Sequence, residues 1–187
     1  EVAYRAASWS VARHYGLAGP SKNGLRAGAI APIGPSARNL NRTFPYADGA
    51  ENQLTHWSAR GLLSDAPAVT EAPHAPNAYD PTSGALDRRA RAYLDVNCAI
   101  CHHPSGPAPG SMDLRVTTPL AGTNTIDVRP EDAVGLGGEL RIAPGSHATS
   151  SVWARVTATD DNRMPPLASH VVDREGAAVL AAWIDSL

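Results

Sequence analysis

Apolar residues recur at helical spacing at the end of the chain. Leu180, Trp183, Ile184 and Leu187 stand at i, i+3, i+4 and i+7, which is typical of one face of an amphipathic helix. Asp173 precedes this segment, where its carboxylate can accept hydrogen bonds from the first N–H groups of a helix. The pattern predicts a C-terminal helix that Asp173 caps.

Two further helices are predicted in the second half of the chain. The first would be capped by Ser83 and would end at Cys98, and its apolar residues share one face: Leu86, Ala90, Tyr93 and Leu94. A shorter helix beginning near Ser150 would turn its apolar residues toward the core: Val152, Trp153 and Val156. Because no strand alternation competes with these patterns, the second half is predicted to be all-α.

The first half is rich in loop-forming residues. Helices are predicted over residues 2–15 and 51–63, while glycines and prolines interrupt residues 16–35. Prolines at positions 67, 73, 76 and 81 forbid a continuous helix, so residues 67–84 are predicted to be an extended linker. The chain is therefore expected to contain a loop-rich, partly helical region over residues 1–66 and a helical domain over residues 85–187.

Composition excludes several classes of protein. A chain of 187 residues, of which 43% are hydrophobic, is long enough to bury a core. The formal net charge is −2, which provides no electrostatic reason to expect nucleic acid as a partner. No apolar run approaches the roughly 18 residues that a transmembrane helix needs. The chain begins at Glu1 without an initiator Met, as a processed secreted chain or a fragment does.

Cys98, Cys101 and His102 form a C-x-x-C-H sequence, which is the attachment signature of c-type haem. Two thiols at this spacing can form thioether links to the two vinyl groups of the porphyrin, and the following imidazole can bind the iron as the proximal ligand. The sequence therefore predicts one covalently bound haem c.

Two other uses of the cysteine pair are possible. A zinc site would need further ligands, such as His102 or His103 with His147 or His170, but no second paired cluster is present. A thioredoxin-like redox pair normally follows a strand, whereas a helix is predicted before Cys98. Both alternatives are less favoured than haem.

A second axial ligand is predicted at Met164. It lies far enough from His102 for the chain to pass around the porphyrin, and Pro165 and Pro166 restrict the backbone of its loop. Core packing is the ordinary role of a methionine. The alternatives are Met112, which follows His102 closely, and two histidines that more commonly have solvated or capping roles: His147 and His170.

Polar neighbours are also expected around the haem. The Nδ1 atom of His102 should donate a hydrogen bond to a backbone carbonyl, for which the turn over residues 106–109 is the best candidate. Three arginines can pair with haem propionates, although each can equally be solvated: Arg141, Arg155 and Arg163.

Residues 85–187 resemble the class I cytochrome c domain, in the variant found at the C-terminal end of secreted bacterial oxidoreductases and multihaem cytochromes. The resemblance lies in residues 91–102, in Pro144-Gly145-Ser146 with residues 150–156, in Met164-Pro165-Pro166-Leu167 and in the final helix. It implies a mainly α fold in which the first and last helices cross, with Tyr93 near Trp183.

Residues 32–42 and 52–63 resemble the segment that follows an earlier C-x-x-C-H motif in di-haem relatives. That motif is absent here, since residues 11–23 contain His14 but no cysteine. The resemblance implies a degenerate cytochrome-like region over residues 1–66, a Pro-rich linker over residues 67–84 and a mono-haem cytochrome c domain over residues 85–187.

The leading functional prediction is a periplasmic bacterial c-type cytochrome that transfers single electrons between redox proteins, alone or as a subunit of a larger, membrane-associated assembly. It would be an electron carrier and not an enzyme, with Cys98, Cys101, His102 and Met164 binding the haem. One alternative is a haem enzyme or a peroxide or gas sensor, in which Met164 readily leaves the iron. Another is a structural subunit of an electron-transfer complex.

Overall fold

Two units divide the chain between Pro76 and Asn77: Gly34–Pro76 forms one, and Asn77–Leu187 belongs to the other. The computed structural model describes residues 36–131, 139–166 and 171–187. The helix predicted over residues 2–15, the interrupted segment that follows it and His14 lie outside the described residues.

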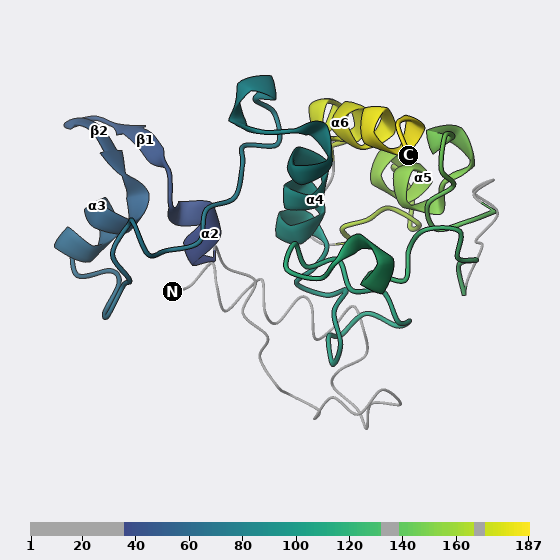
Figure 1. Ribbon diagram of the computed structural model, residues 1–187, viewed down its shortest axis with the longest axis horizontal. Coiled ribbons are helices and arrows are strands. Elements are labelled where there is room, and N and C mark those ends of the chain that lie inside the picture. The colour runs from purple at the N-terminus through teal and green to yellow at the C-terminus, as the bar shows by residue number, and fades with distance from the viewer. Residues whose placement is uncertain (1–35, 132–138, 167–170) are drawn as a thin grey trace. The chain divides into compact units, whose positions relative to one another are not determined.

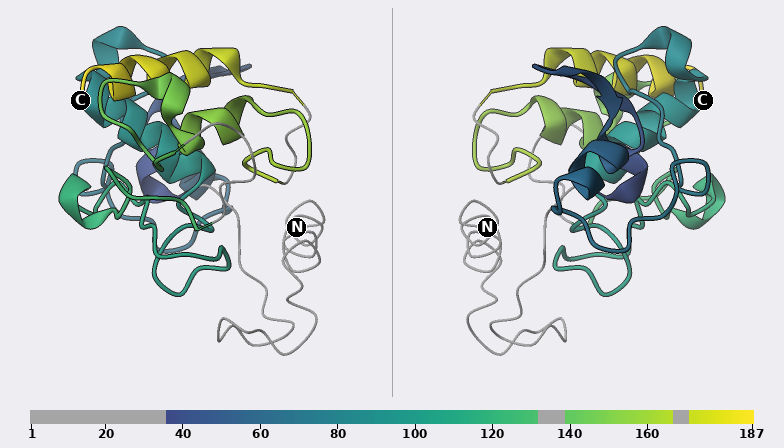
Figure 2. Two further views of the ribbon diagram at one scale, coloured as in Figure 1. Left: turned by 90° about the vertical axis from the view of Figure 1, so that its right-hand side faces the viewer. Right: turned by 90° about the vertical axis from the view of Figure 1, so that its left-hand side faces the viewer.

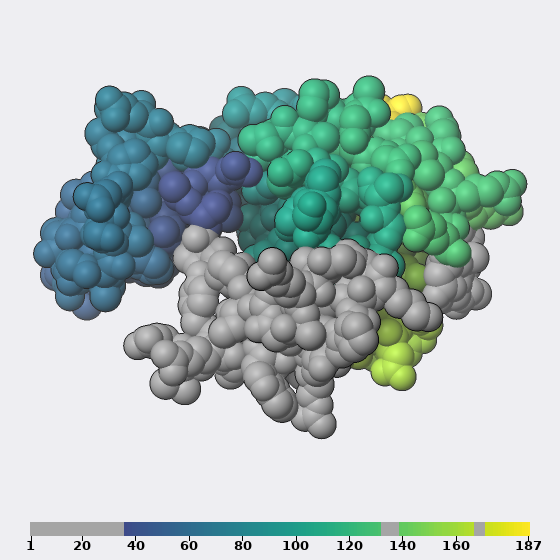
Figure 3. Space-filling model, turned by 90° about the horizontal axis from the view of Figure 1, so that it is seen from below, coloured from purple at the N-terminus to yellow at the C-terminus, as the bar shows by residue number. Residues whose placement is uncertain are grey.

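The larger unit contains three α-helices joined by loops and turns where the structure describes it (Figure 1). Its helices are α4 (Leu86–Asn97), α5 (Ser151–Thr157) and α6 (Arg174–Asp185), with short 3₁₀ turns η1 (Pro81–Ser83), η2 (Leu120–Gly122) and η3 (His147–Thr149). Extended backbone forms only isolated bridges there, between Ile126 and Ile142 and between Leu140 and Ser150. The three predicted helices are confirmed. Figure 3 shows the loop-rich chain between α4 and α5, in teal to green, as a packed surface of this unit.

Helix α6 begins as predicted. The side chain of Asp173 accepts a hydrogen bond of 2.9 Å from the backbone N–H of Gly176, so the cap is confirmed. Leu180, Trp183 and Ile184 are buried, but Leu187 lies beyond the end of the helix at Asp185 and is 40% exposed. The apolar stripe is therefore shorter than the sequence pattern predicted.

Helix α4 begins later than predicted and without a side-chain cap, because Ala85 stands at its N-cap. The hydroxyl group of Ser83 instead donates to the carbonyl oxygens of Asn77 and Asp80, which closes the turn η1. The prediction that Ser83 caps this helix is wrong, because the side chain satisfies the preceding turn. The predicted apolar face is correct: Ala90, Tyr93 and Leu94 are buried, and Leu86 packs against the same core.

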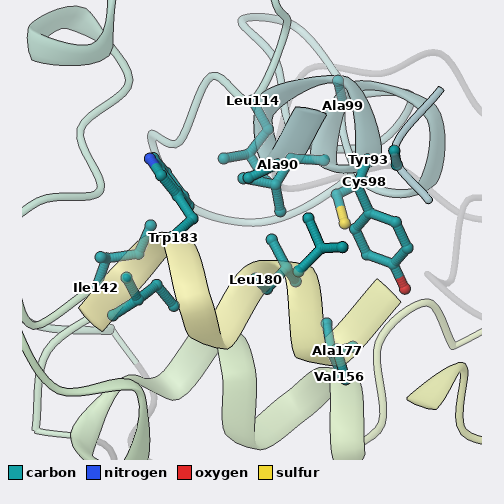
Figure 4. Close-up of a cluster of buried hydrophobic side chains, with 14 residues drawn as sticks. Ala90, Tyr93, Cys98, Ala99, Leu114, Ile142, Val156, Ala177, Leu180 and Trp183 are labelled. Carbon is teal, nitrogen blue, oxygen red and sulfur yellow. The ribbon is translucent and has the colours of Figure 1, made fainter. Parts of the chain in front are cut away.

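Helices α4 and α6 pack against each other in the core of the larger unit (Figures 1, 2 and 4). The ring of Tyr93 lies against Gly176, where an added Cβ atom would overlap with the ring. Trp183 lies two helical turns farther along α6, toward Ile142 in Figure 4. Tyr93 therefore packs at the first turn of α6 and not beside Trp183, because only glycine leaves room there for an aromatic ring.

The smaller unit contains an antiparallel hairpin that the sequence analysis did not predict. Its elements are α2 (Ala37–Leu40), β1 (Thr43–Tyr46), β2 (Gly49–Asn52) and α3 (Gln53–Ala59). Tyr46 pairs with Gly49 at the turn, and the Asp48-Gly49 dipeptide is a known hairpin signal. The helix predicted over residues 51–63 is shortened to α3, because residues 49–52 pair as a strand and Asn52 then caps the helix.

Much of the predicted linker belongs to the smaller unit. The side-chain amide of Asn41 donates to the carbonyl oxygens of Val69 and Ala72, at 3.0 and 2.9 Å. The backbone N–H of Ala75 donates to the backbone carbonyl oxygen of Arg38. Ala72 and Ala75 are buried. The boundary therefore lies after Pro76 and not after residue 66. The reason is that the side chain of Asn41 forms hydrogen bonds with backbone carbonyl oxygens of the Pro-rich segment.

Candidate cofactor site

The end of α4 brings Cys98, Cys101 and His102 into one turn. Cys98 is the C-cap of the helix, and its carbonyl oxygen accepts hydrogen bonds from the N–H groups of Cys101 at 3.0 Å and His102 at 2.9 Å. The structure therefore places the motif in a turn that follows a helix and not a strand.

The two thiols are free and shielded from solvent. Cys98 is buried, and Cys101 is half-buried. Burial, together with the neighbouring Cys101 thiol, raises the pKa of Cys98 to about 12, and burial raises the pKa of Cys101. Both sulfur atoms are therefore protonated thiols at neutral pH, which is not the state of a reactive thiolate pair.

His102 carries a neutral imidazole at neutral pH. Burial, and next the positive charges of Arg141 and Arg155, lower its pKa to about 4. An imidazole must be unprotonated at the nitrogen that binds a metal. The surroundings of His102 therefore keep it ready to act as a ligand.

Arg141 is a buried cation beside this histidine. The side chain of Arg141 is 6% exposed, one of its nitrogen atoms donates to the carbonyl oxygen of Asn124 at 2.7 Å, and another lies 3.7 Å from Glu131. Arg155 donates to the carbonyl oxygen of Asn162. Both arginines therefore have partners in the protein, and their positive charges act on His102.

The loop after the motif packs directly on it. The N–H of Ala108 donates to the carbonyl oxygen of Cys101, and the N–H of Leu114 donates to that of His102. A Cβ atom added to Gly106 would overlap with the carbonyl oxygen of Cys101, so this close approach requires glycine. The hydrogen bond expected between the His102 ring and residues 106–109 is not formed within the described residues; the turn contacts the motif through its backbone.

A buried carboxylate, which sequence reasoning missed, supports the same loop. Asp113 accepts hydrogen bonds from the Arg115 guanidinium, at 2.6 and 2.8 Å, and from the Thr118 hydroxyl at 2.7 Å. Arg91 of α4 donates to the carbonyl oxygens of Arg115 and Thr118. An Asp-x-Arg sequence is too common to predict such a network, which depends on the loop folding back on α4.

Met164 is connected to this region through Arg155. The N–H of Met164 donates to the carbonyl oxygen of Arg155 at 2.9 Å, and the peptide bond between Met164 and Pro165 is cis. The charge of Arg155 also acts on His102. The structure thus links the methionine loop to the helix that carries a neighbour of His102.

The alternative ligands have other contacts. The ring of His147 pairs with Asp185 at 2.7 Å and packs edge-on against Trp153. His103 pairs with the carbonyl oxygen of Pro104, and Met112 packs against the core. His170 lies outside the described residues. Arg163, the third candidate arginine, donates to the carbonyl oxygen of Asp160.

No protein-family model, curated protein or solved structure matches this chain. Within residues 36–131, 139–166 and 171–187, no three His, Cys, Asp or Glu side chains gather as a metal site. The predicted axial ligands of the haem, the imidazole of His102 and the thioether of Met164, do not form a group of this kind. None of the helices in these ranges combines the length and apolar character that a membrane span requires.

Proposed function

We propose that this chain is a c-type cytochrome that transfers single electrons through one covalently bound haem. The observation that supports it most strongly is the turn after α4, in which the carbonyl oxygen of Cys98 accepts hydrogen bonds from the N–H groups of Cys101 and His102. Covalent attachment needs two thiols and one imidazole in this order and spacing.

The residues present fit a haem. Cys98 and Cys101 would hold it through thioether links, and His102, with its neutral imidazole, would bind the iron from one side. When bound, the haem supplies an iron that accepts and releases one electron. Burial of Cys98 and the packing of the 106–114 loop would limit the access of water to the point of attachment.

Met164 would bind the iron from the opposite side. A thioether ligand favours the reduced iron more than a second imidazole does, so the potential would be higher than with two histidines. Arg141 and Arg155 would face the acidic propionates and would also favour the reduced state, because positive charge opposes removal of an electron.

We propose a periplasmic location, with redox proteins as electron donor and acceptor. Both follow from the resemblance to secreted bacterial cytochromes, as does the fold of residues 85–187 as a class I cytochrome c domain. The absence of a membrane-spanning helix concerns the described residues alone.

The test is to export the full chain to the periplasm of a bacterium that contains a haem-attachment machinery. The reduced pyridine haemochrome spectrum and the intact mass should together show one haem joined by two thioether links. Replacing both cysteines, in Cys98→Ala with Cys101→Ala, should abolish covalent attachment. A colourless protein at its bare polypeptide mass would overturn the proposal.

A second pair of variants tests the distal ligand. Met164→Ala should keep the covalent haem but lose the absorption band of the thioether–iron bond, whereas Met112→Ala should keep both. An unchanged spectrum in Met164→Ala would contradict the assignment of Met164. Rapid binding of carbon monoxide to the unmodified reduced protein would favour a sensor or enzyme over an electron carrier.

A further inference from the structure

The segment directly before α4 is bound both to α4 and to the start of α6. We call residues 77–83 the strap. Ala78 of the strap is buried in the larger core, and its carbonyl oxygen accepts two hydrogen bonds from the guanidinium group of Arg89 in α4, at 3.0 and 2.9 Å. The hydroxyl of Tyr79 donates to Oδ2 of Asp173, the N-cap of α6, at 2.8 Å. The strap is therefore fixed at two points, one on each helix.

One carboxylate joins the strap, the helix cap and a buried ring. Besides the Tyr79 hydroxyl, Asp173 accepts the backbone N–H of Gly176 through Oδ1 at 2.9 Å. It also acts on the phenol of Tyr93, both as a negative charge and as a hydrogen-bond partner. Burial, and next the charge of Asp173, raise the pKa of Tyr93 above its usual range, so this phenol keeps its proton. Asp173 is thus shared between the two tyrosines.

The ring of Tyr93 is enclosed by the strap, by α6 and by Cys98. The ring of Tyr79 meets it edge-on, at 86° and with 6.4 Å between the ring centroids, and Gly176 leaves space for it on α6. In Figure 4 the sulfur atom of Cys98 lies beside the same ring, and the two groups interact electrostatically. Because protein interiors are close-packed, a displaced ring shifts its neighbours or leaves a gap. The position of Tyr93 therefore affects the position of the sulfur atom of Cys98.

The second cysteine of the motif is held in a different way. Cys98 belongs to the larger core together with Tyr93. Cys101 is half-buried, and its carbonyl oxygen accepts the N–H of Ala108 and lies close to Gly106, both in the loop after the motif. A change in the strap should therefore be felt at Cys98 much more than at Cys101.

We propose that Tyr79 and Asp173 are positioning residues for Cys98, which hold the ring of Tyr93 against its sulfur atom and so fix that atom in one place. The consequence for attachment rests on the proposed function. A thioether link forms when the S–H group adds across a vinyl double bond, with a new C–S bond at one vinyl carbon and the hydrogen on the other. A displaced sulfur atom would leave some chains linked through Cys101 alone.

The first experiment uses the full chain produced without a haem-attachment machinery, so that both thiols are free. Iodoacetamide is added, and the rate of alkylation at each cysteine is measured by mass spectrometry of the peptides. Cys98 should react more slowly than Cys101. Tyr79→Phe keeps the ring but removes the hydroxyl, and it should raise the rate at Cys98 about two- to tenfold, as expected for a local opening that one hydrogen bond opposes. The rate at Cys101 should not change.

Matched variants separate this role from general effects on stability. Tyr46→Phe in the smaller unit removes a hydroxyl that has no hydrogen-bond partner among the described residues, and it should change neither rate. Asp173→Ser keeps a capping oxygen but is too short to reach Tyr79, so it should also raise the rate at Cys98. Because both substitutions remove the same contact, the double variant should react no faster than Asp173→Ser alone.

Periplasmic export of the same variants gives a second readout. The haemochrome spectrum measures haem per chain, and the intact mass after iodoacetamide treatment shows whether a haem-bearing chain still has a free thiol. In Tyr79→Phe the share of haem-bearing chains with a free Cys98 should rise, whereas Tyr46→Phe should match the unsubstituted chain. Two links in every haem-bearing chain of Tyr79→Phe would overturn the positioning role.

The outcomes distinguish the two proposals. A rate at Cys98 that is unchanged in Tyr79→Phe, or that rises together with the rate at Cys101, overturns the positioning role and leaves the proposed function intact. Equal rates at the two cysteines of the unsubstituted chain overturn it as well. An exported chain without covalent haem overturns the proposed function, while the rates at the free thiols still decide whether the strap positions Cys98.

Discussion

Asp113 is the residue on which the loop beside His102 most depends. Its carboxylate is buried and accepts hydrogen bonds from Arg115 and Thr118, while the neighbouring N–H of Leu114 bonds to His102. The hydrogen bonds from Arg115, and next those from Thr118, hold the pKa of Asp113 well below its usual value of 3.8. The ionised carboxylate is thus the form that stabilises the folded chain.

The sign of the pH dependence follows from this lowered pKa. The stabilisation is complete above the unfolded pKa of about 4 and decreases as the pH falls toward the folded value. Asp113→Asn should lower the free energy of unfolding at pH 7 by about 1–3 kcal/mol. Below pH 4, the free energies of unfolding of the variant and of the unsubstituted protein should become more similar. Urea unfolding at pH 7 and pH 3 measures both. The exposed Asp161→Asn is the control, and a difference that is independent of pH would contradict this role.

At the scale of elements, the contact between α4 and α6 depends on a tyrosine ring that packs against a glycine. Tyr93 occupies the space that a Cβ atom at residue 176 would need. Gly176 therefore sets how closely the first turn of α6 approaches α4. The same turn carries Asp173, so the cap and the helix contact are built from adjacent residues.

Gly176→Ala should therefore destabilise the protein, although alanine is the better helix former. Alanine gains about 1 kcal/mol of helix propensity, while overpacking in a core costs about 1–3 kcal/mol, so a net loss is expected. Thermal or urea unfolding measures the change. Gly122→Ala is the control, because a Cβ atom added there would lie 3.5 Å from Cγ2 of Thr118, which is an ordinary contact distance. Stability equal to or above that of the unsubstituted chain would show that α6 shifts to accept the methyl group.

At the scale of the whole molecule, the described residues form two cores with no residue in common. The larger core contains only residues from Ala78 onward, including Tyr93, Leu180 and Trp183. The smaller core consists of Leu40, Leu54 and Ala72 with a few partly buried neighbours. The cofactor site lies entirely in the larger unit.

A fragment of residues 77–187 should consequently fold and attach haem in the same way as the full chain. The fragment and the full chain should give the same haemochrome absorbance per mole of protein. The absorption band of the thioether–iron bond should also be the same in both. Parallel periplasmic export of the fragment and of the full chain measures both. Loss of haem from the fragment alone would show that residues before Asn77 contribute to the site.

Local signals in the sequence determined the helices of the larger unit and the Asp173 cap, because each depends on residues within one or two turns. The tertiary structure decided what depends on distant partners. It placed Tyr93 against Gly176, bound the Pro-rich segment to Asn41 and shifted the unit boundary to Pro76. It also brought Arg141 and Arg155 near His102, and Tyr79 near Asp173. These contacts join residues that are far apart in the sequence, so no local pattern of residues predicts them.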